Sequence, residues 1–172
     1  MSERGSPVTE HPRPAEVELS AGNSTDLDSV VEVMDAAFDD RFGEAWTRSQ
    51  CAGILPMPGV RLALARFGPG GADGGRAAGF TLFRTIADES ELLLLAVAPE
   101  FRRRGIGQAL LDYFLQSSRD SGASRVHLEV REGNPAIVLY RRAGFTLAGR
   151  RRKYYRGRFG GEFDALTLNC QL

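Results

Sequence analysis

The chain has 172 residues, of which 42% are apolar and 26% charged, and its 22 Lys and Arg residues balance its 22 Asp and Glu residues. One domain of ordinary size fits this length, and the composition excludes wholesale disorder, a collagen-like build and a coiled coil. The longest apolar run, from Leu92 to Ala98, is too short to cross a bilayer, and two cysteines cannot form a disulfide scaffold, so we expect a cytoplasmic protein with no membrane partner.

The first half of the chain predicts a short strand, two helices and a pair of strands. Residues 1–14 hold three prolines and few large apolar side chains. We expect a flexible tail there, without the apolar stretch of a secretory signal, and a single folded domain over residues 15–172. Several N-cap candidates at 23–26 precede apolar residues that recur every three or four positions, which predicts a helix. The expected elements are a strand at 16–20, helices at 27–39 and 46–55, and strands at 60–67 and 77–86, the last two joined by a glycine-rich loop at 68–75.

The second half alternates strands and helices. The apolar run at 91–98 is too short for a typical helix, so we expect a central strand buried on both faces. A long helix at 105–121 follows, and Asn134 with Pro135 suits the start of a shorter one through Arg142. With further strands at 125–131, 145–155 and 163–168, the order predicts a mixed α/β sheet.

A basic, glycine-containing turn between the central strand and the long helix carries the clearest chemical signal. Its sequence, from Arg102 to Gly107, is R-R-R-G-I-G. Such a turn points unpaired backbone N–H groups and the positive end of the helix at one place, and its glycines let a ligand approach the backbone, which predicts an anion site. The lysine and hydroxyl residue of a nucleotide-binding P-loop do not follow, and Leu110 stands where a dinucleotide-binding fingerprint needs a small residue.

This turn and several downstream segments resemble the GNAT superfamily of acyl-CoA-dependent N-acetyltransferases. The shared pattern is R-x-x-G-x-G after an apolar strand, followed by L-E-V-R-E-G-N (128–134), A-I-V-L-Y (136–140), A-G-F (143–145), R-K-Y-Y (152–155) and D-A (164–165). From about Leu92 to Leu168 the chain is similar to the bacterial branch that acetylates the N-terminal alanine of a small-subunit ribosomal protein. The resemblance implies an acetyl-CoA-dependent enzyme whose single domain has a mixed, mostly antiparallel central sheet flanked by helices.

The resemblance also implies roles for individual residues. It makes Glu129 the general base and Tyr140 the general acid of acetyl transfer, with Tyr154 and Tyr155 as candidates for holding the end of an acceptor peptide. The segment from Asn134 to Tyr140 is one residue shorter than in the family pattern. The implied acetyl-CoA contacts are the strand residues Leu95, Ala96 and Val97, which would pair with the pantetheine arm, the pyrophosphate-binding turn Arg102, Arg103, Arg104, Gly105, Ile106 and Gly107, and also Asn134.

The chemistry of amide formation independently favours these residue types. An amine attacks a thioester only when it is unprotonated, and because an α-amino group has a pKa of roughly 7.7 to 8.0, a modest base such as Glu129 suffices. A phenol such as Tyr140 can protonate the leaving thiolate. Each residue also has a purely structural interpretation, Glu129 as a surface carboxylate paired with Arg131 or His127, and Tyr140 as a core aromatic residue.

Other candidate residues carry weaker signals. Glu89 and Glu91 flank the central strand and are reserve bases, because some family members have a glutamate there. His127 stands without a second ligand in the sequence, so we expect no metal site. Cys51 and Cys170 have no histidine nearby in the sequence and are expected to be non-catalytic.

The arginine-rich stretch from 141 to 158 has two interpretations. Between Gly133 and Gly161 there are eight bases and no acid, which is typical of a solvated face or of an anion or RNA contact. We expect a protein N-terminus as the partner and no nucleic acid as the primary ligand. The alternatives are an acetyltransferase of a small-molecule amine, a CoA-binding module without turnover, and an RNA-associated module.

Overall fold

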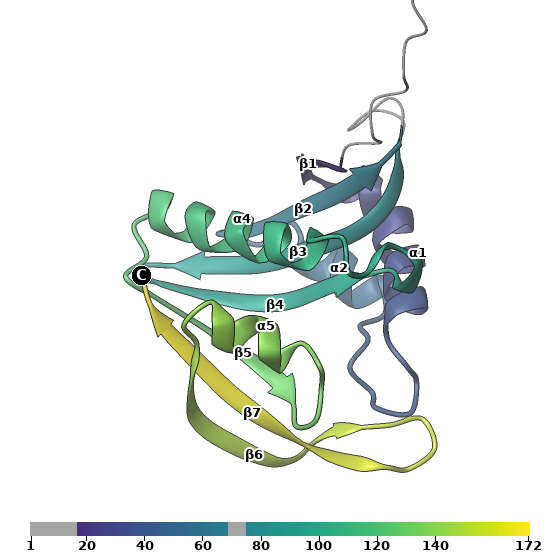
Figure 1. Cartoon of the computed structure of the whole chain (residues 1–172), viewed down its shortest axis with the longest axis vertical. Helices are drawn as coiled ribbons and strands as arrows, with labels where there is room; N and C mark the ends of the chain where they lie inside the picture. Colours follow the sequence, from purple (N-terminus) through teal and green to yellow (C-terminus); the bar gives the residue numbers. More distant parts are fainter. Residues whose placement is uncertain (1–16, 69–74) are drawn as a thin grey trace, which may run out of the picture.

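The computed structural model describes residues 17–68 and 75–172 (Figure 1). The tail predicted at 1–14 and nearly all of the glycine-rich loop lie outside the described residues. No helix within these two ranges is long and apolar enough to span a membrane. In chain order the elements are β1 (Val17–Gly22), η1 (Ser24–Asp26), α1 (Leu27–Ala37), α2 (Arg48–Ile54), β2 (Val60–Phe67), β3 (Arg76–Ile86), β4 (Glu89–Val97), η2 (Pro99–Phe101), α4 (Ile106–Asp120), β5 (Arg125–Arg131), α5 (Ile137–Arg142), β6 (Thr146–Arg156) and β7 (Glu162–Gln171).

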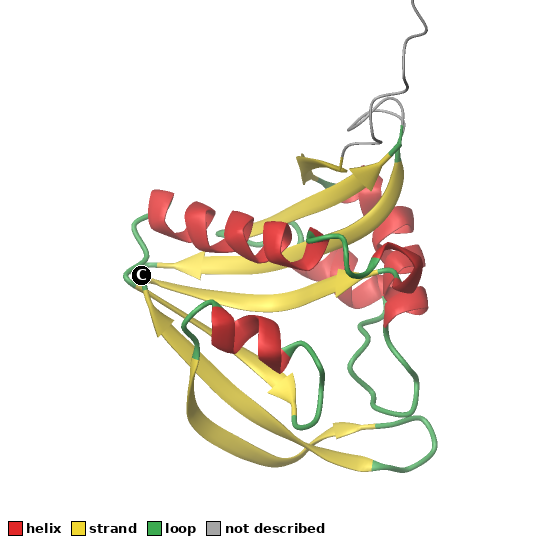
Figure 2. Cartoon of the chain, viewed as in Figure 1, coloured by secondary structure: helices red, strands yellow, loops and turns green. Residues whose placement is uncertain are grey.

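In the part of the chain that the structure describes, the strands form a seven-stranded sheet in the order β1-β2-β3-β4-β5-β7-β6. Every neighbouring pair is antiparallel except β4 and β5, which run parallel. Parallel neighbours need a crossover connection, and α4 provides it. Figure 2 shows α4 and α5 on one face of the sheet and α1 and α2 on the other. The predicted α/β fold, with a mixed, mostly antiparallel sheet flanked by helices, is confirmed.

Local sequence signals account for the start of η1, the short 3-10 helix that leads into α1. The Asn23 side chain accepts a hydrogen bond from the Thr25 N–H, and the Asp26 carboxylate accepts one from the Asn23 N–H, so each side chain satisfies a backbone donor that the helix leaves free. The apolar face that follows packs on the sheet. Its buried members are Leu27, Val30, Val33 and Met34.

An irregularity in β4 decides the shape of the sheet. Leu82 of β3 pairs with Leu94 and Phe83 pairs with Leu92, so Leu93 is an extra residue with no partner in β3. A bulge of this kind bends a strand and changes which face its side chains meet. Leu94 accordingly packs in the core cluster on the α1 side, whereas Leu92 packs in the cluster on the α4 side.

Beyond this bulge, β4 separates from β5. The parallel pairing extends only from Glu89 with Arg125 to Leu92 with Leu128. Figure 1 shows the two strands diverging from there on. The remainder of β4 therefore keeps a free edge on the side of β5.

β4 differs from the prediction of a strand buried on both faces. Its residues alternate between buried and half-buried positions, and Leu93, Leu95 and Val97 belong to the half-buried set. Helices do cover both faces of the sheet, but a cleft opens beside the free edge. The apolar run continues through this opening, so the sequence pattern alone could not reveal it.

Gly79 of β3 leaves no room for a side chain between β4 and α4. A Cβ atom there would lie 2.7 Å from the Ala96 carbonyl oxygen and 3.0 Å from Leu110 Cδ1. We expect Gly79→Ala to lower the free energy of unfolding by about 1–3 kcal/mol, the usual cost of overpacking, in a urea titration. Gly53→Ala on the exposed side of α2 is the matched control, because a Cβ there meets no atom within 4 Å. Gly53→Ala should raise the free energy of unfolding by about 0.5–1 kcal/mol. Equal changes in the free energy of unfolding of the two variants would contradict the packing argument.

Candidate active site

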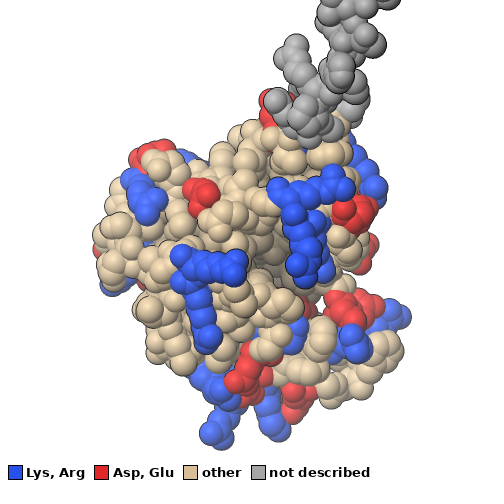
Figure 3. Space-filling view, viewed as in Figure 1, with Lys and Arg blue, Asp and Glu red and all other residues tan. Residues whose placement is uncertain are grey.

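A cleft of about 830 Å³ opens where β4 and β5 separate. Its volume lies in the range of small-molecule sites, roughly 300–1,000 Å³. The lining comes from β4, the start of α4, β5, α5, β6 and the loop between α1 and α2. Figure 3 shows the surface hollowed here, with basic side chains on two sides of the hollow. Every predicted site residue except Arg104 lines this cleft.

The free edge of β4 offers backbone groups to an extended ligand. Leu95, Ala96 and Val97 line the cleft at this edge. Because β3 pairs with β4 on its other side, alternate residues turn their N–H and carbonyl groups toward the cleft. An extended chain with amide groups can pair with such an edge in the manner of an added strand. One acceptor at the end of the strand is already used, because the Val97 carbonyl accepts a hydrogen bond from Arg102 Nε at 3.1 Å.

The turn before α4 has the backbone conformation that its glycines predict. Gly105 has a φ of +77°, and Arg103 also lies in the left-handed region, with a φ of +60°. A Cβ atom at Gly105 would meet no atom within 4 Å, so the space beside this backbone is open. The Ala109 N–H bonds to the Gly105 carbonyl, and the amides before Ala109 have no partner inside the helix. These amides and the positive helix end favour an anion at this turn.

The three arginines of the turn take different positions. Arg102 also donates from Nη2 to the Ala37 carbonyl at 3.0 Å, which ties the end of β4 to the end of α1. Arg103 lines the cleft. The Arg104 guanidinium packs instead over two phenylalanine rings, at 5.1 and 5.8 Å from their centres, and lies outside the cleft lining. The geometry does not bring Arg104 to the predicted cofactor site.

Glu129 lines the cleft from β5, with 16% of its side chain exposed. Thr167 Oγ1 lies 3.0 Å from each carboxylate oxygen, and Arg151 Nε lies 3.3 Å from one of them. Glu129 is thus paired across the sheet, but with Arg151 rather than with Arg131 or His127. A carboxylate has about four acceptor positions, so Glu129 retains capacity for a proton or a water.

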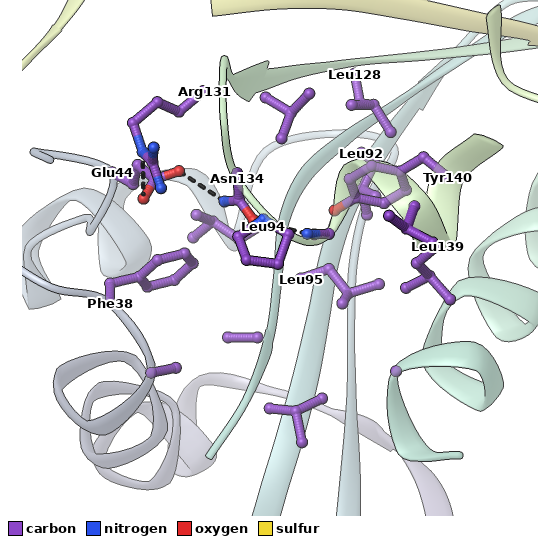
Figure 4. A pocket seen from close by; sticks show the side chains of 18 of the residues that line it. Phe38, Glu44, Leu92, Leu94, Leu95, Leu128, Arg131, Asn134, Leu139 and Tyr140 are labelled. Atoms are coloured by element: carbon purple, nitrogen blue, oxygen red, sulfur yellow. Dashed lines mark hydrogen bonds and ion pairs between the residues drawn. The ribbon is translucent and has the colours of Figure 1, made fainter. Parts of the chain in front are cut away.

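Tyr140 reaches the same cleft from α5, on the other side of β5. Its ring is buried in the core and lies 5.9 Å from the ring of Phe145, while its hydroxyl points into the cleft (Figure 4). Burial and the negative charge of Glu44 raise the pKa of the Tyr140 phenol above its usual value. The hydroxyl therefore remains protonated at neutral pH and can donate a proton. Tyr140 is both a core aromatic and a cleft residue, and the shortened segment after Asn134 does not remove it from the cleft.

Tyr154 and Tyr155 lie next to each other at the β6 side of the cleft. Their rings are 4.9 Å apart and nearly perpendicular. The Tyr155 hydroxyl donates to the Glu129 carbonyl at 3.4 Å, and burial, with the charge of Glu44 next, raises the pKa of this phenol. Tyr154 is about half exposed, with the Arg151 guanidinium 5.3 Å from its ring centre.

Several lining residues were not predicted, and Glu44 is the most prominent. It lies in the loop between α1 and α2 and accepts a hydrogen bond from Asn134 Nδ2 at 2.8 Å (Figure 4). Asn134 is bonded on its other side too, because its Oδ1 accepts the Ala136 N–H at 2.9 Å. Phe42 and Arg131 line the cleft beside Glu44. Glu44 is 90 residues from Asn134 in the chain, and no motif or spacing in the sequence points to it.

The loop between α1 and α2 (residues 38–47) contacts the β6–β7 hairpin, whose turn is at 157–161, as Figure 1 also shows. The approach is backbone to backbone, since a Cβ atom at Gly157 would lie 1.8 Å from the Arg41 carbonyl oxygen. This contact gives the cleft a wall built from two distant parts of the chain. The same segments are joined by the ion pair of Arg158 with Asp40 and by the edge-to-face rings of Phe42 and Phe163.

The arginine-rich stretch is largely neutralised by acids from neighbouring segments. This pairing was not visible in the sequence, because the acids lie on other strands and loops. It favours a solvated surface over an RNA contact, which needs free cations. The pairs are Arg150 with Glu132 and Asp164, Arg151 with Glu129, Lys153 and Arg156 with Glu162, and Arg158 with Asp40.

The remaining candidate residues separate into two groups. Glu91 lines the cleft, whereas Glu89 lies outside it and pairs with Arg125 and His127. Neither cysteine lines the cleft, and burial raises the pKa of Cys51. Over residues 17–68 and 75–172, His, Cys, Asp and Glu side chains form no group of three that could hold a metal ion.

Comparison with known proteins agrees with this geometry. Residues 28–145 match the model of the acetyltransferase (GNAT) family. The Escherichia coli K12 [ribosomal protein bS18]-alanine N-acetyltransferase is 38% identical over 95 residues, which cover 55% of this chain and 64% of that protein. Mycothiol acetyltransferase from Clavibacter sepedonicus is 33% identical over 160 residues, which cover 84% of this chain and 48% of that protein. The chain thus spans less than two thirds of the length of either relative.

Solved structures share the fold. The crystal structure of the ribosomal-protein-S18-alanine N-acetyltransferase from Escherichia coli superposes with a TM-score of 0.76 at 27% identity, over 91% of this chain and 94% of that chain. The similarity covers both halves of the sheet, including the strands N-terminal to Leu92, where the sequence pattern alone was weak.

Coenzyme A is a direct probe of the α4 turn. Because Arg103 lines the cleft and Arg104 does not, we expect Arg103→Ala to weaken coenzyme A binding about tenfold, the effect of losing roughly 1.5 kcal/mol from a hydrogen bond to a charged group. Arg104→Ala is the matched control and should change the dissociation constant less than about twofold. Isothermal titration calorimetry measures both, and a larger loss for Arg104→Ala than for Arg103→Ala would refute the assignment.

Proposed function

This chain belongs to the acetyltransferase (GNAT) family, and from that membership we propose that it transfers an acetyl group from acetyl-CoA to the α-amino group of a protein. The favoured acceptor is the N-terminal alanine of a small-subunit ribosomal protein, which makes the cytoplasm the place of action. The observation that carries the proposal is the cleft between β4 and β5. It collects a free strand edge, a basic helix start, a carboxylate and a protonated phenol in one space.

The residues along the cleft suit the two ends of acetyl-CoA. The amides at the start of α4 and Arg103 hold the diphosphate, and the open space beside Gly105 gives it access to the backbone. The free edge of β4 from Leu95 to Val97 pairs with the amide-containing pantetheine arm. The bound molecule supplies an activated acetyl thioester. Its carbonyl oxygen is polarised by a backbone N–H near Val97, a contribution of roughly 3–4 kcal/mol in other acyl-transfer enzymes.

Glu129 and Tyr140 handle the two protons of the reaction. The acceptor nitrogen forms a bond to the acetyl carbon, and Glu129 takes the proton that this nitrogen loses, directly or through a water. When the carbon–sulfur bond breaks, Tyr140 gives its hydroxyl proton to the sulfur. The raised pKa of Tyr140 keeps that proton in place until it is needed. The two side chains reach the cleft from opposite sides of β5, which leaves space for the reacting groups between them.

The acceptor is assigned to the side of the cleft formed by the 38–47 loop and β6. Tyr154 and Tyr155 lie there beside Glu129, and aromatic rings of this kind can hold a peptide end. The similarity to the Escherichia coli bS18-alanine N-acetyltransferase supports a protein N-terminus. The similarity to mycothiol acetyltransferase over 84% of this chain supports a small-molecule amine as the second candidate.

Acceptor-dependent release of CoA thiol separates the candidates. The acceptors are a ribosomal-protein peptide that starts with alanine, the same peptide with a blocked N-terminus and an internal lysine, and spermidine. Release with the free N-terminus alone supports the proposal. Equal release with spermidine would favour the small-molecule amine, and equal release with the blocked peptide would contradict selectivity for the N-terminus. Acetyl-CoA binding without release from any acceptor would indicate a binding module.

Glu129→Gln and Tyr140→Phe test the assigned proton transfers. Each should lower kcat by about 10²- to 10⁴-fold, the usual contribution of a general acid or base, and leave the dissociation constant for acetyl-CoA nearly unchanged. Glu132→Gln is the matched control, because Glu132 is an exposed carboxylate outside the cleft, and its kcat should equal that of the unmodified enzyme. A full rate in Glu129→Gln together with a reduced rate in Glu91→Gln would transfer the role of base to Glu91.

Gly157→Ala tests whether the wall formed by the 38–47 loop and the β6–β7 hairpin binds the acceptor. The added Cβ forces the hairpin away from the Arg41 carbonyl, and a misplacement of about 1 Å in a binding wall can cost about 10²-fold. We expect the KM for the acceptor peptide to rise and the dissociation constant for acetyl-CoA to remain the same. Gly149→Ala in β6, where a Cβ has ordinary 3.8 Å contacts with Thr167, is the control and should change neither constant. An effect confined to acetyl-CoA binding would show that this wall serves the cofactor.

A further inference from the structure

Glu44 is a buried carboxylate that the proposed reaction does not use. Only 9% of its side chain is exposed, although it lies in a connecting loop rather than in a helix or strand. Oε1 accepts the Asn134 Nδ2 hydrogen bond, and Oε2 lies 3.2 Å from Arg131 Nε. A carboxylate is costly to bury, so a fixed set of partners is needed to hold it there.

Arg131 and Phe42 fix the position of Glu44. The Arg131 guanidinium stacks on the Phe42 ring at 3.7 Å from its centre and donates from Nη1 to the Glu132 carbonyl. Its side chain is 10% exposed. The carboxylate of Glu44 is thereby held between β5 and the turn that leads into α5.

A continuous set of hydrogen bonds leads from Glu44 to the helix that carries Tyr140. Asn134 donates to Glu44 with its amide nitrogen and accepts the Ala136 N–H with its amide oxygen. The Ala136 carbonyl in turn accepts the Tyr140 N–H at 3.1 Å. The hydrogen bond to Glu44 therefore fixes the Asn134 amide from the side opposite to the bond with Ala136. Figure 4 shows Glu44, Asn134 and Tyr140 around the same cleft.

We propose that Glu44 is a positioning residue for acetyl transfer: it holds the Asn134 amide, which caps the turn before α5 and so keeps the Tyr140 hydroxyl in the cleft. This inference rests on the proposed function, because the effect on the rate requires Tyr140 to act as the acid. The loop between α1 and α2 then has two roles: it forms part of the wall at which the acceptor binds, and through Glu44 it positions Asn134. The electrostatic effect of Glu44 on the Tyr140 phenol agrees with their proximity.

The test uses two changes that separate the hydrogen bond from the charge. Glu44→Gln keeps an oxygen that accepts from Asn134 but loses the negative charge. The double variant Glu44→Leu with Arg131→Met removes the acceptor and leaves no unpaired buried charge, so the protein is expected to fold. Asp35→Asn is the control, because Asp35 is an exposed carboxylate of the preceding helix α1 and lies outside the cleft lining.

Amide hydrogen exchange of the enzyme without ligands gives the first readout. Loss of the Asn134 cap should speed exchange of the Ala136 N–H about tenfold in the double variant, as expected for one lost hydrogen bond. Glu44→Gln and Asp35→Asn should leave this rate unchanged. Unchanged exchange in the double variant would overturn the proposal, whether or not the enzyme is active on the peptide.

Steady-state kinetics gives the second readout. The double variant should lose about 10- to 100-fold in kcat, as for a misplaced catalytic group, with unaltered acetyl-CoA binding. Glu44→Gln should restore kcat to within about threefold of the unmodified enzyme. Faster Ala136 exchange with a normal kcat would also overturn the positioning role. Absence of thiol release in the unmodified enzyme would instead refute the proposed function.

Discussion

The separation of β4 from β5 is the constraint on which the rest of this structure depends. A parallel pair would ordinarily continue along its whole length, but the extra residue Leu93 bends β4 away after four paired positions on each strand. The unpaired stretch of β4 then exposes backbone donors and acceptors that the sheet itself cannot satisfy. A ligand with its own amide groups can form these hydrogen bonds, so the unpaired stretch of β4 is an edge at which such a ligand can bind.

The proposed function assigns one side of the resulting cleft to the cofactor and the other to the acceptor. The cofactor side is local in the sequence, since β4 leads through η2 and its following turn directly into α4. The acceptor side is assembled from the 38–47 loop and the β6–β7 hairpin, which meet by close backbone packing. Glu129 and Tyr140 lie between these two sides because β5 and α5, which carry them, are consecutive elements that both border the opening.

The basic residues of the cleft and those of the later arginine-rich stretch have different surroundings. The bases at the start of α4 include Arg103 in the cleft, whereas most bases of the later arginine-rich stretch are paired with acids such as Glu132 and Glu162. A count of arginines along the chain therefore overstates the unpaired positive charge of the arginine-rich stretch at 141–158. Within the cleft, the buried pair of Glu44 and Arg131 leaves little net charge while it orients its polar neighbours.

The sequence by itself determined the element order and the basic, glycine-containing turn before α4, because these depend on short-range periodicity, capping and motif spacing. Its resemblance to a known family pointed to Glu129 and Tyr140 as candidate catalytic residues. The sequence did not determine that Arg104 packs outside the cleft, that β4 is half-buried along its free edge, or that Glu44 belongs to the site. Those features arise from contacts between segments far apart in the chain. Local patterns carry no record of such contacts, so only the tertiary structure decided them.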